Sequence, residues 1–256
     1  MQLMQINSLR FQAAFKAMTV HLGLSLLVAA AVALFVFTLW FPYPYRELAG
    51  GSELFILVIA VDLVCGPLLT IVLYSPTKPK REMLTDISLI VAIQLLALCY
   101  GIWTVWQVRP LFVVQEADRL TLISRANLAL NELDSLPNEL KPSFFGGPIQ
   151  VSLRELTTLE REKLIEEIKA RRHDASEHPS FYVKYDGAKA YANGHLLKDL
   201  LRIQPALQSQ IEAIKSKSKM NSSEQLRYLY IIGRNYRLAI INIEGYIEDY
   251  MVDLQH

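Results

Sequence analysis

The chain has 256 residues, 52% of them hydrophobic, and its 26 basic and 25 acidic residues leave a formal net charge of +1. A charge this close to zero disfavours nucleic acid as the main partner, because phosphate binding usually needs a basic face. Long apolar runs dominate the sequence up to residue 109, and regularly spaced charges follow. We therefore expect a membrane domain over residues 1–109 and a separate α+β domain over residues 110–256.

Three apolar stretches are expected to cross a membrane as helices, which takes about 20 residues each. They lie near residues 18–41, 54–74 and 87–108, and only the second contains a charge, Asp62. Aromatic residues that favour membrane interfaces gather at their ends, among them Trp40, Phe41 and Trp103. The first run extends past the core of a signal peptide, so we expect it to stay in the membrane.

Basic residues in the flanks predict the orientation of these spans, because Lys and Arg concentrate on the cytoplasmic side. They are Arg10 and Lys16 before the first span, Arg46 in the first loop, and Lys78, Lys80 and Arg81 in the second loop. The N-terminus and the second loop are thus expected in the cytoplasm, and the domain after the third span outside it. Arg109 lies on the wrong side for this rule, but a single charge does not outweigh the others.

The connections over residues 41–51 and 75–80 are short and rich in Pro and Gly, which predicts three antiparallel helices packed as a bundle. Both cysteines, Cys65 and Cys99, lie in apolar runs. The domain after residue 109 therefore cannot contain a disulfide framework or a thiolate metal site.

The second span carries a stripe of polar and small residues. An intramembrane carboxylate costs about 2.5–3.5 kcal/mol on insertion scales, so Asp62 is expected to face other helices. Gly66 and Thr70 follow at intervals of four on the same helix face, and Pro67 is expected to bend the helix beside them. This stripe suits helix docking. It packs either against a partner or against the protein's own first and third spans, where Gln94 could hydrogen-bond to Asp62.

The domain after residue 109 reads as α+β. Residues 111–115 and 119–124 predict strands, and residues 157–172 predict a helix that starts with a capping box of Thr157 and Glu160. A second helix is expected within residues 206–217. Residues 226–233 and 236–243 predict a hairpin, and residues 246–254 predict either a third strand or a closing helix.

Reactive clusters are sparse in this sequence. We find no phosphate-binding glycine loop, nucleophile elbow or zinc-protease motif. His173 and His178 are expected on the surface, because a metal site would need a third ligand at a known spacing. A proton relay from Asp62 to His21 would need more titratable groups than the spans contain. We therefore expect no catalytic residue, cofactor or metal.

Several stretches resemble the type IV pilin accessory proteins of the TfpX/TfpZ type. The likeness covers nearly the whole chain and is strongest up to Leu120, whereas residues 240–256 match no diagnostic motif of that family. The stretches are HLGLS (21–25), FPYPYRELAGGSELF (41–55), VDLVCGPLLT (61–70) and YGIWTVWQVRPLFVVQEADRL (100–120).

The resemblance implies a bacterial inner-membrane protein that aids the assembly or dynamics of a type IV pilus and is not an enzyme. Its expected partners are the lipid bilayer and the major pilin, contacted at its transmembrane helix and its head domain. We expect Asp62, Gly66, Pro67 and Thr70 to contact that helix. A homo-oligomer remains open, as do a pilin-modifying enzyme of glycosyltransferase type and a membrane-anchored sensory or binding protein.

Overall fold

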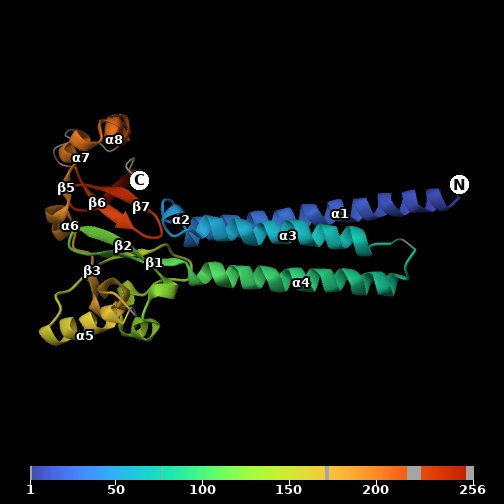
Figure 1. Ribbon diagram of the computed structural model, residues 1–256, viewed down its shortest axis with the longest axis horizontal. Coiled ribbons are helices and arrows are strands. Elements are labelled where there is room, and N and C mark those ends of the chain that lie inside the picture. Colours follow the sequence, from blue (N-terminus) through green and yellow to red (C-terminus); the bar gives the residue numbers. More distant parts are fainter. Residues whose placement is uncertain (1, 76, 171–172, 218–225, 252–256) are drawn as a thin grey trace. The chain divides into compact units, whose positions relative to one another are not determined.

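The computed structural model describes residues 2–75, 77–170, 173–217 and 226–251, and in it the chain forms two compact units. A helical unit comprises Met1–Thr38 and Gly51–Gln107, and a sheet unit comprises Leu39–Gly50 and Val108–His256. Figure 1 shows the long helices of the first unit and the strands and short helices of the second. The connection between the first two predicted spans therefore belongs to the sheet unit.

The helical unit consists of α1 (Gln2–Phe35), which a π-helical turn (Val36–Trp40) extends, α3 (Gly51–Leu73) and α4 (Lys80–Gln107). In the described part of the chain, three helical stretches are long and apolar enough to cross a membrane: Phe11–Trp40, Gly51–Leu73 and Lys80–Gln107. Each helical stretch starts before the start of the corresponding predicted span, and its last residue is one position before the predicted end.

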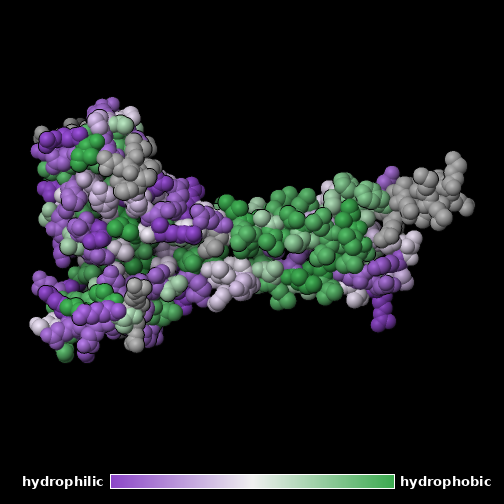
Figure 2. Space-filling view, in the orientation of Figure 1, coloured by the Kyte–Doolittle hydropathy of each residue, from purple (hydrophilic) through white to green (hydrophobic). Residues whose placement is uncertain are grey.

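On the face that Figure 2 shows, hydrophobic residues cover most of the long helices. Leu27 is 67% exposed and Leu96 is 71% exposed. Large apolar patches of this kind on a folded surface mark contact with a membrane or with another protein. These helices therefore indicate a membrane protein.

The sheet unit is built on a mixed sheet, which has eight strands among the described residues, in the order β4-β3-β1-β2-β6-β7-β8, with β5 paired to β6. The pairs β1–β3 and β2–β6 are parallel, and the others are antiparallel. The strands are β1 (Pro110–Gln115), β2 (Arg119–Ser124), β3 (Ile149–Leu153), β4 (Tyr182–Lys184), β5 (His195–Leu196), β6 (Arg227–Ile232), β7 (Tyr236–Ile241) and β8 (Ile247–Met251).

The central strand β1 is buried along its whole length, which suits its place between an antiparallel and a parallel neighbour. From Phe112 to Val114 its side chains alternate between two apolar clusters. Val113 packs in one cluster with Leu120 and Leu229, whereas Phe112 and Val114 pack in the other. The core of this unit therefore lies on both faces of the sheet.

The helix predicted over residues 157–172 is present over Thr158–Lys169, and residues 171–172 lie outside the described residues. The helix expected within residues 206–217 is present over Gln208–Lys217. β1, β2, β6 and β7 lie where strands were expected, and β8 decides for a strand over a closing helix, while residues 252–254 of that prediction lie outside the described residues. β3, β4 and β5 were not predicted. The short helices of the unit are α2 (Tyr45–Leu48), α5 (Thr158–Lys169), α6 (Gly187–Asn193), α7 (Leu197–Ile203) and α8 (Gln208–Lys217).

Helix α5 begins at the predicted capping box. The Thr157 side chain accepts from the backbone N–H of Glu160, and the Glu160 carboxylate accepts from the backbone N–H of Thr157. Together they satisfy two N–H groups that a helix start would otherwise leave unpaired. Arg154 adds a 2.7 Å ion pair to the same carboxylate. The segment before α5 is thus fixed to its first turn.

The segment Leu39–Gly50 docks on the β6–β7 hairpin of its own unit. Leu48 is fully buried, and its carbonyl accepts from the backbone N–H groups of Arg234 at 2.7 Å and Asn235 at 3.2 Å. The hydroxyl groups of Tyr45 and Tyr250 lie 2.9 Å apart. These contacts join the first interspan connection to strands near the C-terminal end of the chain.

Residues at or just after the ends of the first and third candidate spans are buried in the sheet unit. Trp40 is 2% exposed and Phe41 is fully buried. The side chains of these two aromatics are therefore packed within protein, whereas Trp103 on α4 is 54% exposed. Arg109 is also buried. Burial, with a contribution from the charge of Arg125, lowers the pKa of Arg109 to about 10, so its guanidinium stays charged at neutral pH.

Candidate partner-binding site in the helical bundle

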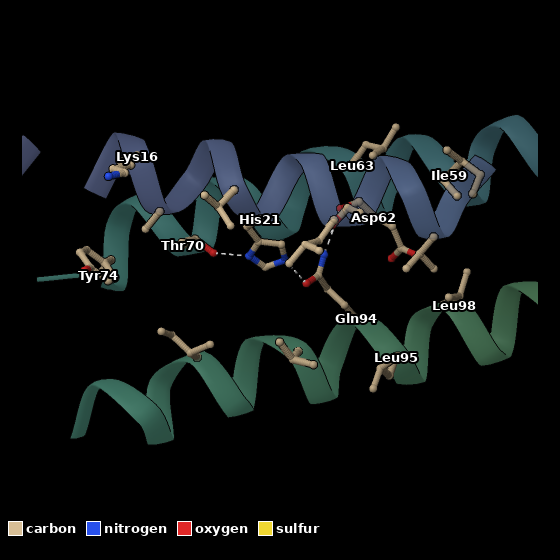
Figure 3. Close-up of a pocket in the computed structure, with 18 of the residues that line it drawn as sticks. Lys16, His21, Ile59, Asp62, Leu63, Thr70, Tyr74, Gln94, Leu95 and Leu98 are labelled. Carbon is tan, nitrogen blue, oxygen red and sulfur yellow. Dashed lines mark hydrogen bonds between the residues drawn. The ribbon is translucent and has the colours of Figure 1, made fainter. Parts of the chain in front are cut away.

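A polar cluster joins the three long helices inside the bundle (Figure 3). His21 of α1 lies between Thr70 of α3 and Gln94 of α4. Its Nδ1 is 2.6 Å from Thr70 Oγ1, and its Nε2 is 2.6 Å from Gln94 Oε1. Gln94 also donates from Nε2 to the main-chain carbonyl of Asp62 at 3.2 Å. Each helix thus contributes a side chain to one hydrogen-bond network.

The partners in this network determine which ring nitrogen of His21 carries a hydrogen. Gln94 uses its amide nitrogen to donate to a carbonyl, so its oxygen faces His21 and can only accept. Nε2 of His21 must therefore donate, and in a neutral imidazole Nδ1 then accepts. Thr70 has one hydroxyl hydrogen for two acceptors, this Nδ1 and the Gly66 carbonyl at 3.0 Å.

The structure places the predicted stripe on the face of α3 that meets this cluster. A Cβ atom on Gly66 would lie 1.9 Å from Gln94 Nε2, so only glycine leaves room for the glutamine. Gly66 and Pro67 are buried, and Thr70 is 5% exposed. The helix α3 is continuous through Pro67, although proline supplies no N–H to it.

The predicted contact between Gln94 and Asp62 exists, but it uses the main-chain carbonyl of Asp62. The Asp62 carboxylate makes no hydrogen bond to any residue that the structure describes. No hydrogen bond therefore links it to His21, which lies on the same cavity. The sequence anticipated which two residues meet, and tertiary packing decided which atoms do.

A cavity of about 700 Å³ lies beside the polar cluster, among α1, α3 and α4. Helix α3 packs along both α1 and α4, whereas α1 and α4 have no comparable packing against each other in the described part of the chain. The walls are mostly apolar, as at Leu24 and Leu95. Of the residues that line the cavity, Asp62 is the only carboxylate and Lys16 the only amine. The site can accept an apolar surface and offer it a few polar contacts.

A second close contact between helices was not singled out in the sequence. Gly101 of α4 is buried against α3, and a Cβ atom there would lie 2.3 Å from Val58 Cγ1. A small residue lets two helix backbones approach closely in a membrane. A lone glycine within an apolar span is the signal that could have found it.

His178 of the sheet unit was predicted to lie on the surface, and this prediction is wrong. It is 7% exposed rather than on the surface, because a loop folds it against two carboxylates. Its Nδ1 is 3.0 Å from Glu132 Oε1, and its Nε2 is 2.9 Å from Glu167 Oε2. His173, by contrast, has a side chain that is 36% exposed. No three His, Cys, Asp or Glu residues of the described chain are placed to hold a metal ion.

Glu132 anchors this part of the sheet unit. Its carboxylate accepts from both the backbone N–H and the hydroxyl of Ser180, at 3.1 and 2.6 Å, and it contacts His178. Burial acts to raise the pKa of Glu132, but the hydrogen bonds from Ser180 and His178 outweigh it and hold the pKa below its usual value. Glu132 is therefore a structural carboxylate that stays ionised.

Comparison with known proteins places the chain in a family. Residues 9–50 match the family described as fimbrial assembly protein FimB. The fimbrial assembly protein of serogroup I from Dichelobacter nodosus is 31% identical over 240 residues, which cover 92% of this chain and 93% of that protein. Its serogroup E1 counterpart is 30% identical over the same shares of both chains.

A third relative, the fimbrial assembly protein of serogroups C1 and C2 from the same organism, is 41% identical over 128 residues, half of this chain and 98% of that protein. No solved structure matches the chain. The similarity extends through the helical unit and the sheet unit alike, and it confirms the resemblance to type IV pilin accessory proteins. The chain belongs to the family of fimbrial assembly proteins.

Proposed function

We propose that this protein is an inner-membrane accessory protein that assists the assembly or dynamics of a type IV pilus by docking the major pilin. The cavity beside the polar cluster receives the transmembrane helix of the pilin, and the sheet unit contacts its head domain. Membership of a fimbrial assembly family supports the process. The apolar helices and the basic residues of their flanks support a multi-pass protein with a cytoplasmic N-terminus and a periplasmic sheet unit.

The observation that carries this proposal is the cavity of about 700 Å³ among α1, α3 and α4. A helix is about 10 Å across and rises about 1.5 Å per residue, so this volume equals about six residues of helix. The site therefore suits one side of a docked helix over one or two turns. The pilin offers such a helix, because it waits in the same membrane as a single apolar span with an outward head.

Asp62 is the stripe residue placed to meet that helix. It lines the cavity and is not engaged by a described side chain, whereas Gly66 and Thr70 contact α4 and α1. A carboxylate in a membrane cavity finds a hydrogen-bond donor or a positive group when one is offered. We therefore expect Asp62 to contact a polar group of the docked pilin.

Two neighbouring leucines of α4 give a matched test of the docking site. Leu95 lines the cavity and is 54% exposed, whereas Leu96 does not line it and is 71% exposed. A photo-crosslinking amino acid is introduced at one or the other position in cells that make the pilin. We expect a pilin adduct from position 95 and none from position 96. Equal adducts from both, or adducts only within the chain or with a second copy, would refute docking in this cavity.

The mass of the pilin separates this proposal from a pilin-modifying enzyme. In a strain that lacks the protein, fewer or shorter pili built from pilin of unchanged mass support a role in assembly. A pilin that has lost a mass increment would instead assign the protein an enzymatic role.

A further inference from the structure

A short aromatic loop of the sheet unit, residues 143–147, is hydrogen-bonded to Trp40 and Arg109, which lie at or next to the ends of two candidate spans. We call it the phenylalanine loop. The indole Nε1 of Trp40 donates to the carbonyl of Phe144 at 3.0 Å. Arg109 donates from Nη2 to the carbonyl of Ser143 at 2.6 Å and also to the carbonyl of Gly146. Two side chains thus hold the backbone of the loop.

Trp40 and Arg109, which hold the loop, lie at or next to the ends of two candidate spans. Trp40 is the last residue of the first candidate span, and Arg109 follows the third, which ends at Gln107. The chain crosses the membrane twice, through the second and third spans, between the end of the first span and the end of the third. Both ends therefore lie on the same side of the membrane. The phenylalanine loop is therefore bound to two residues that lie at or next to span ends on one side of the membrane.

The loop presents two aromatic rings to its surroundings. Phe144 is 50% exposed and Phe145 is 64% exposed. Their rings pack edge to face with centroids 4.9 Å apart, and the Phe144 ring also packs edge to face on Trp40 at 5.6 Å. The Phe144 ring thus packs on Trp40, which is itself buried.

We propose that the phenylalanine loop inserts into the interfacial region of the bilayer, in the leaflet where the first and third spans end. Aromatic side chains are favoured at that depth, and burial of exposed ring surface stabilises insertion. Irregular backbone enters a membrane only when its polar groups have partners. Trp40 and Arg109 supply those partners to the carbonyls of the loop. Arg109, which opposes the rule for basic residues, thus acts as an anchor.

Spin-label accessibility in lipid vesicles tests the insertion. The purified full chain carries Cys65→Ala and Cys99→Ala, and a nitroxide is attached to one introduced cysteine. Phe145→Cys reports on the loop. Ile203→Cys is the matched control, because Ile203 is also apolar and is 65% exposed but lies on α7, a different element of the sheet unit. Leu96→Cys reports on the middle of α4.

The ratio of collision rates with oxygen and with a water-soluble nickel chelate measures the depth of each label. We expect the highest ratio at position 96, an intermediate ratio at position 145 and the lowest at position 203. Equal ratios at 145 and 203 would overturn the insertion, and so would shielding of position 145 from both reagents, which indicates a protein contact. A water-exposed label at position 96 would refute both the membrane assignment and the insertion. The pilin is absent from these vesicles, so docking is not tested.

Discussion

Replacement of Gly66 by alanine is expected to break the polar cluster of the bundle. The new Cβ would lie 1.9 Å from Nε2 and 2.4 Å from Cδ of Gln94, so the glutamine side chain must move away. It then loses its hydrogen bond to the Asp62 carbonyl and the one that His21 donates to it. The two helices α1 and α4 lose their shared side-chain contact at this level.

The cost can be worked out from these two hydrogen bonds. Measured bonds between helices in a membrane average about 0.6 kcal/mol and reach about 1.7 kcal/mol, so their loss costs about 1–3 kcal/mol. Alanine in place of glycine returns about 0.5–1 kcal/mol through helix propensity. The single variant is therefore destabilised by about 0–2.5 kcal/mol. In a Gln94→Ala background the clash is absent, and Gly66→Ala becomes neutral or stabilising.

A double-mutant cycle of Gly66→Ala and Gln94→Ala cancels the change in helix propensity, because that change is the same in both backgrounds. We expect a coupling free energy of about 1–3 kcal/mol between the two substitutions. The measurement is unfolding by sodium dodecyl sulfate in lipid–detergent micelles. It is followed by energy transfer between dyes on Cys65 and Cys99, which are exposed on α3 and α4. Additivity of the two substitutions within about 0.5 kcal/mol would refute the packing of Gly66 on Gln94.

Gly23 of α1 is a matched control for this experiment. A Cβ atom at Gly23 meets nothing within 4 Å, so Gly23→Ala changes helix propensity without a clash. We expect this variant to be as stable as the parent or slightly more stable. A loss of stability like that of Gly66→Ala would show that the assay responds to any glycine replacement in the spans.

The remaining predictions concern three other sites. Gly101→Ala should weaken packing of α4 on α3, because its Cβ would lie 2.3 Å from Val58 Cγ1, and Val58→Ala should restore the lost stability in the same unfolding assay. The pKa of Glu132 in the folded chain lies below its usual 4.5 despite burial. The ionised carboxylate therefore stabilises the fold fully at neutral pH, and this stabilisation is lost as the pH falls below 4.5 and through the folded-state pKa. Glu132→Gln should be less stable than the parent at pH 7, and its thermal unfolding should depend less on acid pH. Gly245→Ala should destabilise the sheet unit by more than about 1 kcal/mol in thermal unfolding, because φ is 81° and the Cβ would lie 1.8 Å from the Gly187 carbonyl oxygen.

Each of these predictions has an outcome that contradicts it. An unrestored double variant would mean that Gly101 matters for another reason than its contact with α3. Parallel acid profiles of the parent and Glu132→Gln would show that another group controls the acid response. Gly146→Ala serves as the control for Gly245→Ala, because its Cβ would meet Ser143 at an ordinary 3.5 Å. Equal losses at the two glycines would refute the argument from φ.

Local signals in the sequence were enough to predict most helices and strands. Apolar runs longer than a membrane is thick predicted the three spans. Short apolar stretches predicted β1 and β2, and Thr157 with Glu160 predicted the start of α5. The strands β4 and β5, with three and two residues, were missed because so short a stretch has no period to read.

The candidate site was predicted in part. Spacing alone placed Asp62, Gly66 and Thr70 on one face of α3, because residues four apart on a helix are neighbours. The sequence did not determine what that face meets. Burial of Trp40, Arg109 and His178 was equally invisible, since each is covered by residues from a distant part of the chain.

Local patterns in the sequence predicted the three candidate spans, the α+β class of the following domain and the stripe on α3, because each pattern depends on residues that are close together in the chain. Tertiary structure alone decided that His21 meets Gln94, which lies 73 positions away, and that the Leu39–Gly50 segment docks on a hairpin far along the chain. Such contacts depend on how helices and strands are packed side by side. No local pattern records that packing, so only the folded chain reveals a polar cluster beside an open cavity.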